Sequence, residues 1–346
     1  MERILLEKFA GKKIILFSVQ TFNYEKIIAD KLRSYNAEVF YFDERPSNSN
    51  FSKGIIRIKR SLYQQTIDKY YKDILQKVKN VDFDYLLAIR GEVIPGFFLE
   101  EFKLRNPKCK LIFYTWDAFA NHNHALSILD YFDRKFTFDT NDANNYKIGF
   151  RPLFYIDDYK EVSYKSKNFY DVLFIGTAHS DRYLISNQIS EWCKKHGFKS
   201  YNYYYMHGRL VYWYKRIFEK GFEKVNFRQL SFKSISQPQI ITLYNQSRII
   251  LDIQHPNQSG LTMRTFEAIG AKKKIITTNK EISKYSFYNE NNILIIDRND
   301  IILNPDFFKT DFQEIDEKYY LAMSIDGWIN EIFFDATSNF WINQFK

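Results

Sequence analysis

The sequence predicts an α/β protein with two doubly wound domains, in which helices cover both faces of a mostly parallel sheet. Three observations indicate this class. The chain has 346 residues, which is too long for a typical single domain and enough for two. Apolar runs of strand length recur along it, separated by stretches of helical period. The alternation stops once, at the polar residues 156–168, and then restarts.

Residues 1–155 are predicted to form the N-terminal domain. Its expected strands are nearly continuous apolar runs, as in strands that are buried on both faces: 13–19, 37–43, 84–89, 110–115, 135–139 and 151–155. The expected helices lie between these strands, at 23–35, 62–80, 95–105, 125–132 and 142–147. Residues 45–61 are polar and basic without a clear period, and we expect a loop or excursion there.

Residues 156–168 are interpreted as a linker, and residues 169–324 as the C-terminal domain. Its expected strands are 170–175, 199–206, 248–253, 274–278 and 293–296. Its expected helices are 183–196, 210–220, 237–246 and 262–269. Residues 325–346 form a separate helical segment, because their Trp, Phe and Ile residues have the spacing of a helix packed on a larger body.

The composition restricts the class of protein. Lys and Arg exceed Asp and Glu by 9, which favours an anionic partner or simply solubility, since the basic residues are scattered. No recognised nucleic-acid module is present, so we expect no nucleic-acid partner. Cys109 and Cys193 are far apart and indicate a reducing compartment. Without a signal peptide or an apolar run of spanning length, we expect a cytoplasmic protein that is at most peripheral to a membrane.

The most informative stretch is 251–279, where a strand, a loop, a helix and a strand follow one another. Ser259, Gly260, Leu261 and Thr262 lie where the loop enters the helix. Gly260 allows a close approach to the backbone, and free N–H groups at a helix start favour a diphosphate. Within the first turns, Arg264 is suited to pair with the same anion, and Glu267 to accept hydrogen bonds from ribose hydroxyls. A surface Arg–Glu pair is the structural alternative.

One dipeptide and two further residues are candidate donor ligands. Gly176 and Thr177 end the first strand of the second domain, and ligands of such sheets bind beyond the carboxyl ends of the strands. Arg182 follows nearby. His255 lies in the loop after strand 248–253. An ordinary strand–helix turn and structural histidines are the alternatives.

An inverting transfer reaction needs a general base, and Asp117 is the first candidate for it. Asp117 follows strand 110–115 and so lies at the carboxyl end, where ligands bind. Glu92, after strand 84–89, is the second candidate. Asp139 and Asp142 come third, and an Asp at a strand end is often only a helix cap. We assign no metal ligands.

The segment 201–222 is both aromatic and basic. Core packing is the favoured interpretation of such a stripe. The alternative is a surface that makes peripheral contact with an anionic membrane.

Four segments in order along the chain resemble GT-B glycosyltransferases: 115–119 (TWDAF), 136–146 (FTFDTNDANNY) with 150–155 (FRPLFY), 174–182 (FIGTAHSDR) and 260–268 (GLTMRTFEA) with the strand that follows. The similarity is greatest to the bacterial group of lipopolysaccharide, capsule or spore-coat (CgeB-like) polysaccharide synthesis. It implies two Rossmann-like domains facing across a cleft. It also implies a C-terminal helix that returns to the N-terminal domain and a reaction without metal or cofactor.

The resemblance further implies a nucleoside-diphosphate-sugar donor on the C-terminal domain and a saccharide or lipid-linked acceptor on the N-terminal domain. The family's ribose-binding carboxylate corresponds to Glu267, and its phosphate loop to 259–262. Many retaining members carry a second Glu, which here falls on Ser259, so the anomeric outcome stays open. An epimerase of nucleotide sugars with the same fold and a non-catalytic binding protein are the alternative functions.

Overall fold

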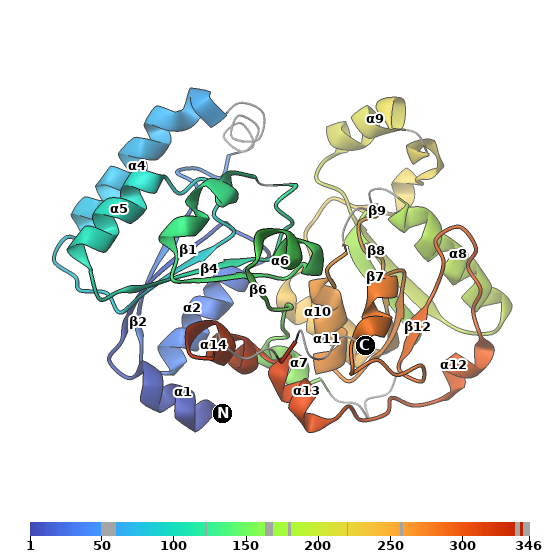
Figure 1. Ribbon diagram of the computed structural model, residues 1–346. Coiled ribbons are helices and arrows are strands. Elements are labelled where there is room, and N and C mark those ends of the chain that lie inside the picture. The colour runs from blue at the N-terminus through green and yellow to red at the C-terminus, as the bar shows by residue number, and fades with distance from the viewer. Residues whose placement is uncertain are drawn as a thin grey trace. The chain divides into compact units, whose positions relative to one another are not determined.

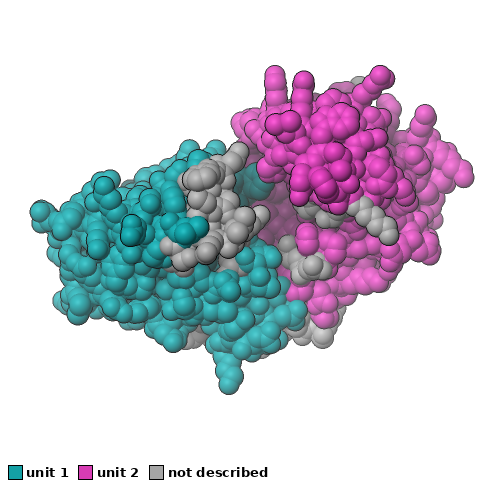
Figure 2. Space-filling view, turned by 90° about the horizontal axis from the view of Figure 1, so that it is seen from above, with its two compact units in different colours: residues 1–152, 325–342 teal, residues 153–324, 343–346 magenta. Residues whose placement is uncertain are grey.

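The computed structural model describes residues 1–49, 60–121, 123–162, 169–178, 181–219, 221–256, 259–335 and 340–341. The chain divides into two compact units (Figure 2). Unit 1 comprises residues 1–152 and 325–342, and unit 2 comprises residues 153–324 and 343–346. Each unit has its own parallel six-stranded sheet within the described residues, with helices on both faces (Figure 1). This confirms the predicted fold class.

The sheet of unit 1 has the order β2-β1-β3-β4-β5-β6, and all its strand pairs are parallel. Its strands are β1 (Lys13–Ser18), β2 (Glu38–Asp43), β3 (Tyr85–Ile89), β4 (Lys110–Thr115), β5 (Arg134–Thr137) and β6 (Gly149–Phe150). The order reverses direction between the neighbours β1 and β3. In doubly wound sheets this switch point is where ligands bind.

Helices from the first 152 residues cover this sheet. They are α1 (Glu2–Phe9), α2 (Tyr24–Ser34), η1 (Arg60–Tyr63), α4 (Gln64–Lys77), α5 (Gly96–Arg105), η2 (Asn123–Tyr131) and α6 (Thr140–Tyr146). The central strands are buried on both faces, and β1 buries all residues from Ile14 to Ser18. One apolar cluster joins β1, β3 and β4 to the inner faces of α4 and α5.

The last described helix, α14 (Ile325–Phe333), belongs to unit 1, as the sequence predicts. Trp328 packs edge-on against Tyr114 of β4, with ring centroids 4.9 Å apart. The Arg151 guanidinium is fully buried, and its Nε lies 2.6 Å from a carboxylate oxygen of Glu331. Trp341 donates to the same carboxylate over 3.0 Å. A buried ion pair of this kind fixes the position of the helix, because loss of either partner leaves a buried charge.

The sheet of unit 2 has the order β12-β11-β10-β7-β8-β9, again with parallel pairs. Its strands are β7 (Tyr170–Thr177), β8 (Ser200–Tyr205), β9 (Leu230–Ser231), β10 (Ser247–Asp252), β11 (Lys274–Thr277) and β12 (Ile293–Ile295). Three strands follow one another in one direction from β7 and three in the other from β10. This is the strand order of the dinucleotide-binding Rossmann fold, with its switch point between β7 and β10.

Helices of unit 2 lie between these strands and after them. They are α7 (Asp157–Lys160), α8 (Arg182–Lys195), α9 (Arg209–Phe218), η3 (Phe222–Lys224), η4 (Phe227–Gln229), α10 (Gln237–Asn245), α11 (Met263–Gly270), η5 (Lys280–Lys284), α12 (Pro305–Lys309) and α13 (Glu317–Ala322). A second apolar cluster joins β7, β10 and α8. Gly270 ends α11 where an added Cβ would lie 2.5 Å from the Tyr155 ring, so a larger residue does not fit.

Two expectations are wrong or incomplete. The predicted strand 151–155 does not form, because Pro152 lacks an N–H for a ladder and the Arg151 side chain is buried against Glu331. Tyr155 instead makes an isolated bridge to Ser324, and the strand of this region is β6. Helix α1 was not predicted. The linker residues 163–168 and residues 50–59 of the expected excursion lie outside the described residues.

Candidate functional site

The switch point of unit 2 brings several predicted donor ligands together. Gly176 and Thr177 end β7, and Asp252 ends the neighbouring strand β10. Ile250 pairs with Leu173 across these strands, so both strands end at the same edge of the sheet. The loop from β10 then leads into the start of α11, where residues 259–262 lie. A strand edge and a helix start converge here, as in nucleotide-binding sheets.

The loop before α11 is held by Asp252, which the sequence did not predict as a site residue. Its carboxylate accepts hydrogen bonds from the Thr262 hydroxyl at 2.9 and 2.8 Å and from the Thr265 hydroxyl at 2.7 Å. Thr262 is the N-cap residue of α11, but its hydroxyl is turned to Asp252 and does not cap the helix. The Thr265 N–H donates to the Thr262 carbonyl at 3.1 Å, so the N–H groups of Met263 and Arg264 are the ones at this helix start that the Thr262 hydroxyl leaves uncapped. An anion satisfies such groups well.

A side chain beyond β11 holds the same loop from the other side. The Asn279 amide donates to the carbonyl oxygens of Ser259 at 3.1 Å and Gly260 at 3.3 Å. Leu261 is buried with 1% of its surface exposed, so its side chain anchors the loop in the core. His255 is exposed in the preceding part of the loop. The backbone of 259–262 is thus fixed from two strands.

Three arginines lie at this edge of the sheet. The Arg182 Nε donates to the Ile253 carbonyl over 2.8 Å. Arg298 forms an ion pair with Asp181 at 2.6 Å and donates to the Gln254 carbonyl at 2.6 Å. Burial and then repulsion from Arg264 lower the pKa of Arg182 to about 10. The charge of Arg298 adds to this effect on Arg182, and an oligophosphate relieves such a concentration of positive charge.

Glu267 lies on the inner side of α11 with 9% of its surface exposed. The Tyr244 hydroxyl of α10 donates to its Oε2 over 3.2 Å. Burial opposes the charge of Arg264, but Tyr244 and Glu267 outweigh it and raise the pKa of that guanidinium. Arg264, Glu267 and Tyr244 thus form one electrostatic group. The ribose contact of Glu267 stays a prediction.

Gly176 and two lysines after α11 have structural roles. An added Cβ at Gly176 would lie 2.7 Å from the Phe174 ring, so packing alone requires glycine there. Lys273 and Lys274, from the basic run after α11, are both 3% exposed and do not form a surface patch. Lys274 donates instead to the Phe307 carbonyl over 2.6 Å.

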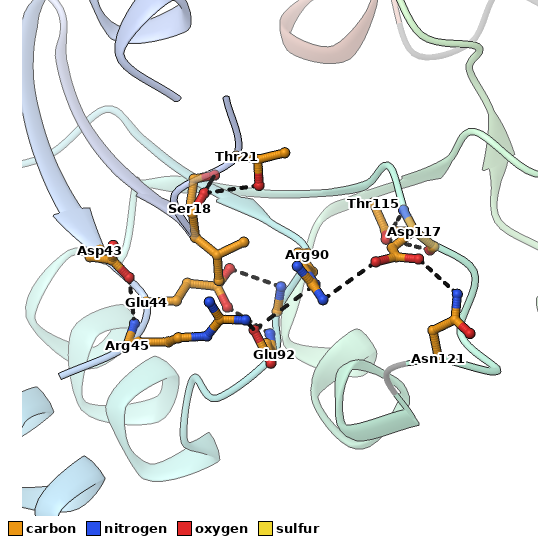
Figure 3. A network of polar contacts seen from close by, with 12 residues as sticks. Ser18, Thr21, Asp43, Glu44, Arg45, Arg90, Glu92, Thr115, Asp117 and Asn121 are labelled. Carbon is orange, nitrogen blue, oxygen red and sulfur yellow. Dashed lines mark hydrogen bonds and ion pairs between the residues drawn. The ribbon is translucent and has the colours of Figure 1, made fainter. Parts of the chain in front are cut away.

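The switch point of unit 1 carries a second polar network (Figure 3). Glu44, just after β2, is fully buried and was not predicted. Its carboxylate accepts the backbone N–H groups of Gly91 at 2.9 Å and Glu92 at 2.6 Å. Arg90 and Gly91 have φ values of +93° and +66°, so this carboxylate stabilises a left-handed turn after β3. Burial raises the pKa of Glu44 to about 8, although the two N–H donors counteract it.

This turn carries two charged side chains, of which Arg90 reaches Asp117 and Glu92 reaches Arg45 (Figure 3). Glu92 pairs with Arg45 at 2.5 Å and is 8% exposed. Asp117, after β4, is paired with Arg90 at 3.4 Å, while the Asn121 amide donates to it over 2.9 Å. The Asp117 side chain keeps 31% of its surface exposed, so it reaches solvent where Glu92 does not.

Asp139 and Asp142, the third choice for the general base, both have structural roles. Asp139 caps α6, since its side chain accepts the N–H groups of Asn141 and Asp142. Asp142 accepts the backbone N–H of Phe119 at 2.9 Å. Both are therefore helix-cap or loop-fixing residues, which was the alternative interpretation from the sequence.

Among the described residues, no group of three or more His, Cys, Asp or Glu residues is placed to hold a metal ion. Within the same part of the chain, the helices are too short or too polar to cross a lipid bilayer.

Neither a family model nor a curated protein matches the sequence. Solved structures do match. A glycosyltransferase from Rickettsia africae ESF-5 is 12% identical, with 95% of this chain and 99% of that chain covered and a TM-score of 0.57. The catalytic domain of starch synthase IV from Arabidopsis thaliana, bound to ADP and acarbose, is 7% identical over 95% and 93% of the two chains, with a TM-score of 0.50.

The UDP-GlcNAc 2-epimerase of Methanocaldococcus jannaschii, in complex with UDP-GlcNAc and UDP, is also similar. It is 10% identical over 97% of this chain and 96% of that chain, with a TM-score of 0.46. The chain therefore has the fold of GT-B glycosyltransferases, with two Rossmann-like units.

Proposed function

We propose that this protein is a glycosyltransferase that transfers a sugar from a nucleoside-diphosphate donor to a saccharide or lipid-linked acceptor. We place its work in the cytoplasm, in the synthesis of a bacterial surface polysaccharide. The fold supports the class of enzyme, and the site in unit 2 supports the donor. Because one fold hosts many chemistries, the proposed activity rests on the residues of the site and not on the fold alone.

The observation that carries this proposal is the set of arginines beside an uncapped helix start. Arg182 is fixed beyond the carboxyl end of β10 by its hydrogen bond to the Ile253 carbonyl, Arg264 lies in the first turn of α11, and the Thr262 hydroxyl does not cap that helix. Burial and the charge of Arg264 lower the pKa of Arg182. A diphosphate bound there offsets the positive charge and accepts hydrogen bonds from the uncapped N–H groups. In this proposal Glu267 accepts the ribose hydroxyls, oriented by the Tyr244 hydroxyl.

The chemical step follows from this arrangement. The bond between the anomeric carbon and the diphosphate oxygen breaks, and the acceptor oxygen forms the new bond to that carbon. Negative charge grows on the leaving diphosphate, and Arg182, Arg264 and the α11 N-terminus stabilise it. Asp117 in unit 1 takes the proton of the acceptor hydroxyl, with Arg90 and Asn121 orienting the carboxylate.

Titration calorimetry tests the donor assignment. We expect UDP, GDP, ADP or dTDP to bind the wild-type protein, and the matching nucleoside without phosphate to bind at least about tenfold more weakly. Arg264→Gln is expected to lose that difference. Arg248→Gln is the matched control, because Arg248 lies at the amino end of β10, opposite to the end that carries the site, and pairs with Asp171 and Asp311 at 3.8 Å. Equal binding of diphosphate and nucleoside would refute the assignment.

A second experiment separates transfer from epimerisation. A glycosyltransferase releases nucleoside diphosphate in proportion to the acceptor that is glycosylated, whereas an epimerase changes the sugar of the nucleotide sugar without any acceptor. Conversion of the donor to its epimer in the absence of acceptor would favour the epimerase.

A further inference from the structure

Helix α9 presents an apolar face to solvent. Its large side chains recur at the spacing i, i+3, i+4, i+7, i+8, which in most surface helices faces the core. Here the face points to solvent, and each of its five residues is 53–85% exposed: Leu210, Trp213, Tyr214, Ile217 and Phe218. The favoured sequence interpretation, that this stripe is core packing, is therefore wrong for the outer face of α9.

The orientation of α9 is fixed from its other side. Tyr212 is the buried residue of the helix, and its hydroxyl donates to the Val225 carbonyl over 3.1 Å. Its ring packs against Phe222 and Phe227, with centroids 5.8 and 5.1 Å away. Arg216 donates to the same hydroxyl over 2.8 Å. The exposed face is thus imposed by a well-packed anchor on the opposite face.

Exposed apolar residues are concentrated on this helix. Among the described residues, fifteen large hydrophobic side chains are exposed, and six of them lie within the ten residues of α9. The others are scattered singly or in pairs over both units, as on ordinary surfaces. In Figure 1, α9 projects at one end of unit 2, away from its sheet. A contiguous patch of this kind marks an interaction surface.

The charge around the patch selects the partner. Residues 209–233 contain seven basic and two acidic residues. Arg209 begins α9, and Lys215 and Arg216 follow in it. Lys215 is paired with Glu219, and Arg216 is bonded to the Tyr212 hydroxyl. A helix with Trp, Tyr and Phe on one side and basic residues along its border has the composition of helices that lie in the interface of anionic bilayers.

We propose that α9 docks unit 2 onto an anionic lipid bilayer, with the five exposed side chains in the interfacial region and the basic residues against the headgroups. The docking needs no catalytic activity and is separate from the proposed sugar transfer. It would hold the enzyme on the surface that presents a lipid-linked acceptor.

Vesicle co-sedimentation of the full-length protein tests this docking. We expect the wild type to bind vesicles of phosphatidylcholine with phosphatidylglycerol, and to bind vesicles of phosphatidylcholine alone at least about tenfold more weakly. The double variant Trp213→Ser/Ile217→Ser is expected to lose a further tenfold or more on the anionic vesicles. The control is Leu104→Ser/Ile302→Ser, whose side chains are exposed by 81% and 72% but do not belong to α9.

A spectroscopic readout locates the contact. Brominated lipid is expected to quench part of the tryptophan fluorescence of the wild type. This quenching is expected to be absent in Trp213→Phe, which keeps an aromatic ring but lacks the tryptophan of α9. Circular dichroism confirms that each variant is folded. Equal vesicle binding by the Ser variant and the wild type, or by neutral and anionic vesicles, would overturn the proposal. So would a self-association that the Ser variant abolishes in the absence of vesicles, since the patch would then join two copies of the chain.

Discussion

Replacing Arg182 with glutamine separates stability from ligand binding in the proposed donor site. Burial and repulsion from Arg264 lower the pKa of Arg182 from 12.5 to about 10. This corresponds to roughly 3 kcal/mol of unfavourable free energy on the charged form. The substitution relieves that cost and loses the charged hydrogen bond to the Ile253 carbonyl, worth about 1.5–3 kcal/mol. We therefore expect the free energy of unfolding to change by less than about 1.5 kcal/mol.

Binding of a nucleoside diphosphate is expected to respond differently. Arg182→Gln removes one cation from the diphosphate, so affinity should fall by roughly 10- to 100-fold. Urea denaturation measures the first effect and titration calorimetry the second. Arg248→Gln is again the control, with unchanged affinity expected. A variant that is clearly destabilised but binds the nucleotide as tightly as the wild type would refute the reasoning.

Further variants test the remaining assignments. Asp117→Asn is expected to lower kcat by about 100- to 10,000-fold with unchanged donor affinity, and a variant that keeps full kcat would exclude Asp117 as the base. Glu267→Ala should raise the donor KM at least about tenfold while circular dichroism shows a folded chain, and wild-type donor affinity would contradict the ribose assignment. Glu44 has a pKa near 8 in the folded protein against 4.5 when unfolded, so its contribution to stability is complete below pH 4.5 and is lost as pH rises through 8. The free energy of unfolding, measured by thermal denaturation between pH 5 and 8, should therefore fall more steeply with pH in the wild type than in Glu44→Gln, by up to about 1.4 kcal/mol per pH unit. Parallel slopes of the two proteins would contradict that pKa. Chelation with EDTA should leave donor binding unchanged, whereas loss of binding that Mg²⁺ restores would assign a metal to the site.

Most of the fold was predictable because the central strands are buried on both faces and carry continuous apolar runs. β4 (KLIFYT) and β10 (SRIILD) are of this kind, and each follows a recognisable helix. The predicted strand 151–155 failed for a tertiary reason, since burial of Arg151 depends on Glu331, far along the chain. α9 shows a further limit: the spacing of an apolar stripe is the same whether it faces a core or a bilayer.

The site was predictable only where its residues are neighbours in sequence. The segment from Ser259 to Glu267 could be found because a loop, a glycine and a helix start adjoin. Tyr244 and Asn279 reach the same place from other elements, and no local pattern indicates this. Asp252 carried a usable signal, because a carboxylate directly after a buried strand lies at the binding edge of such a sheet. Glu44 had none, since its role depends on the left-handed turn at Arg90 and Gly91.

A crystal structure with a bound nucleoside diphosphate tests the central claim most directly. The diphosphate is expected against the first turn of α11, within hydrogen-bond distance of Arg182 and Arg264, with the ribose beside Glu267. A nucleotide bound away from the carboxyl ends of β7 and β10, with those arginines untouched, would contradict the proposed donor site.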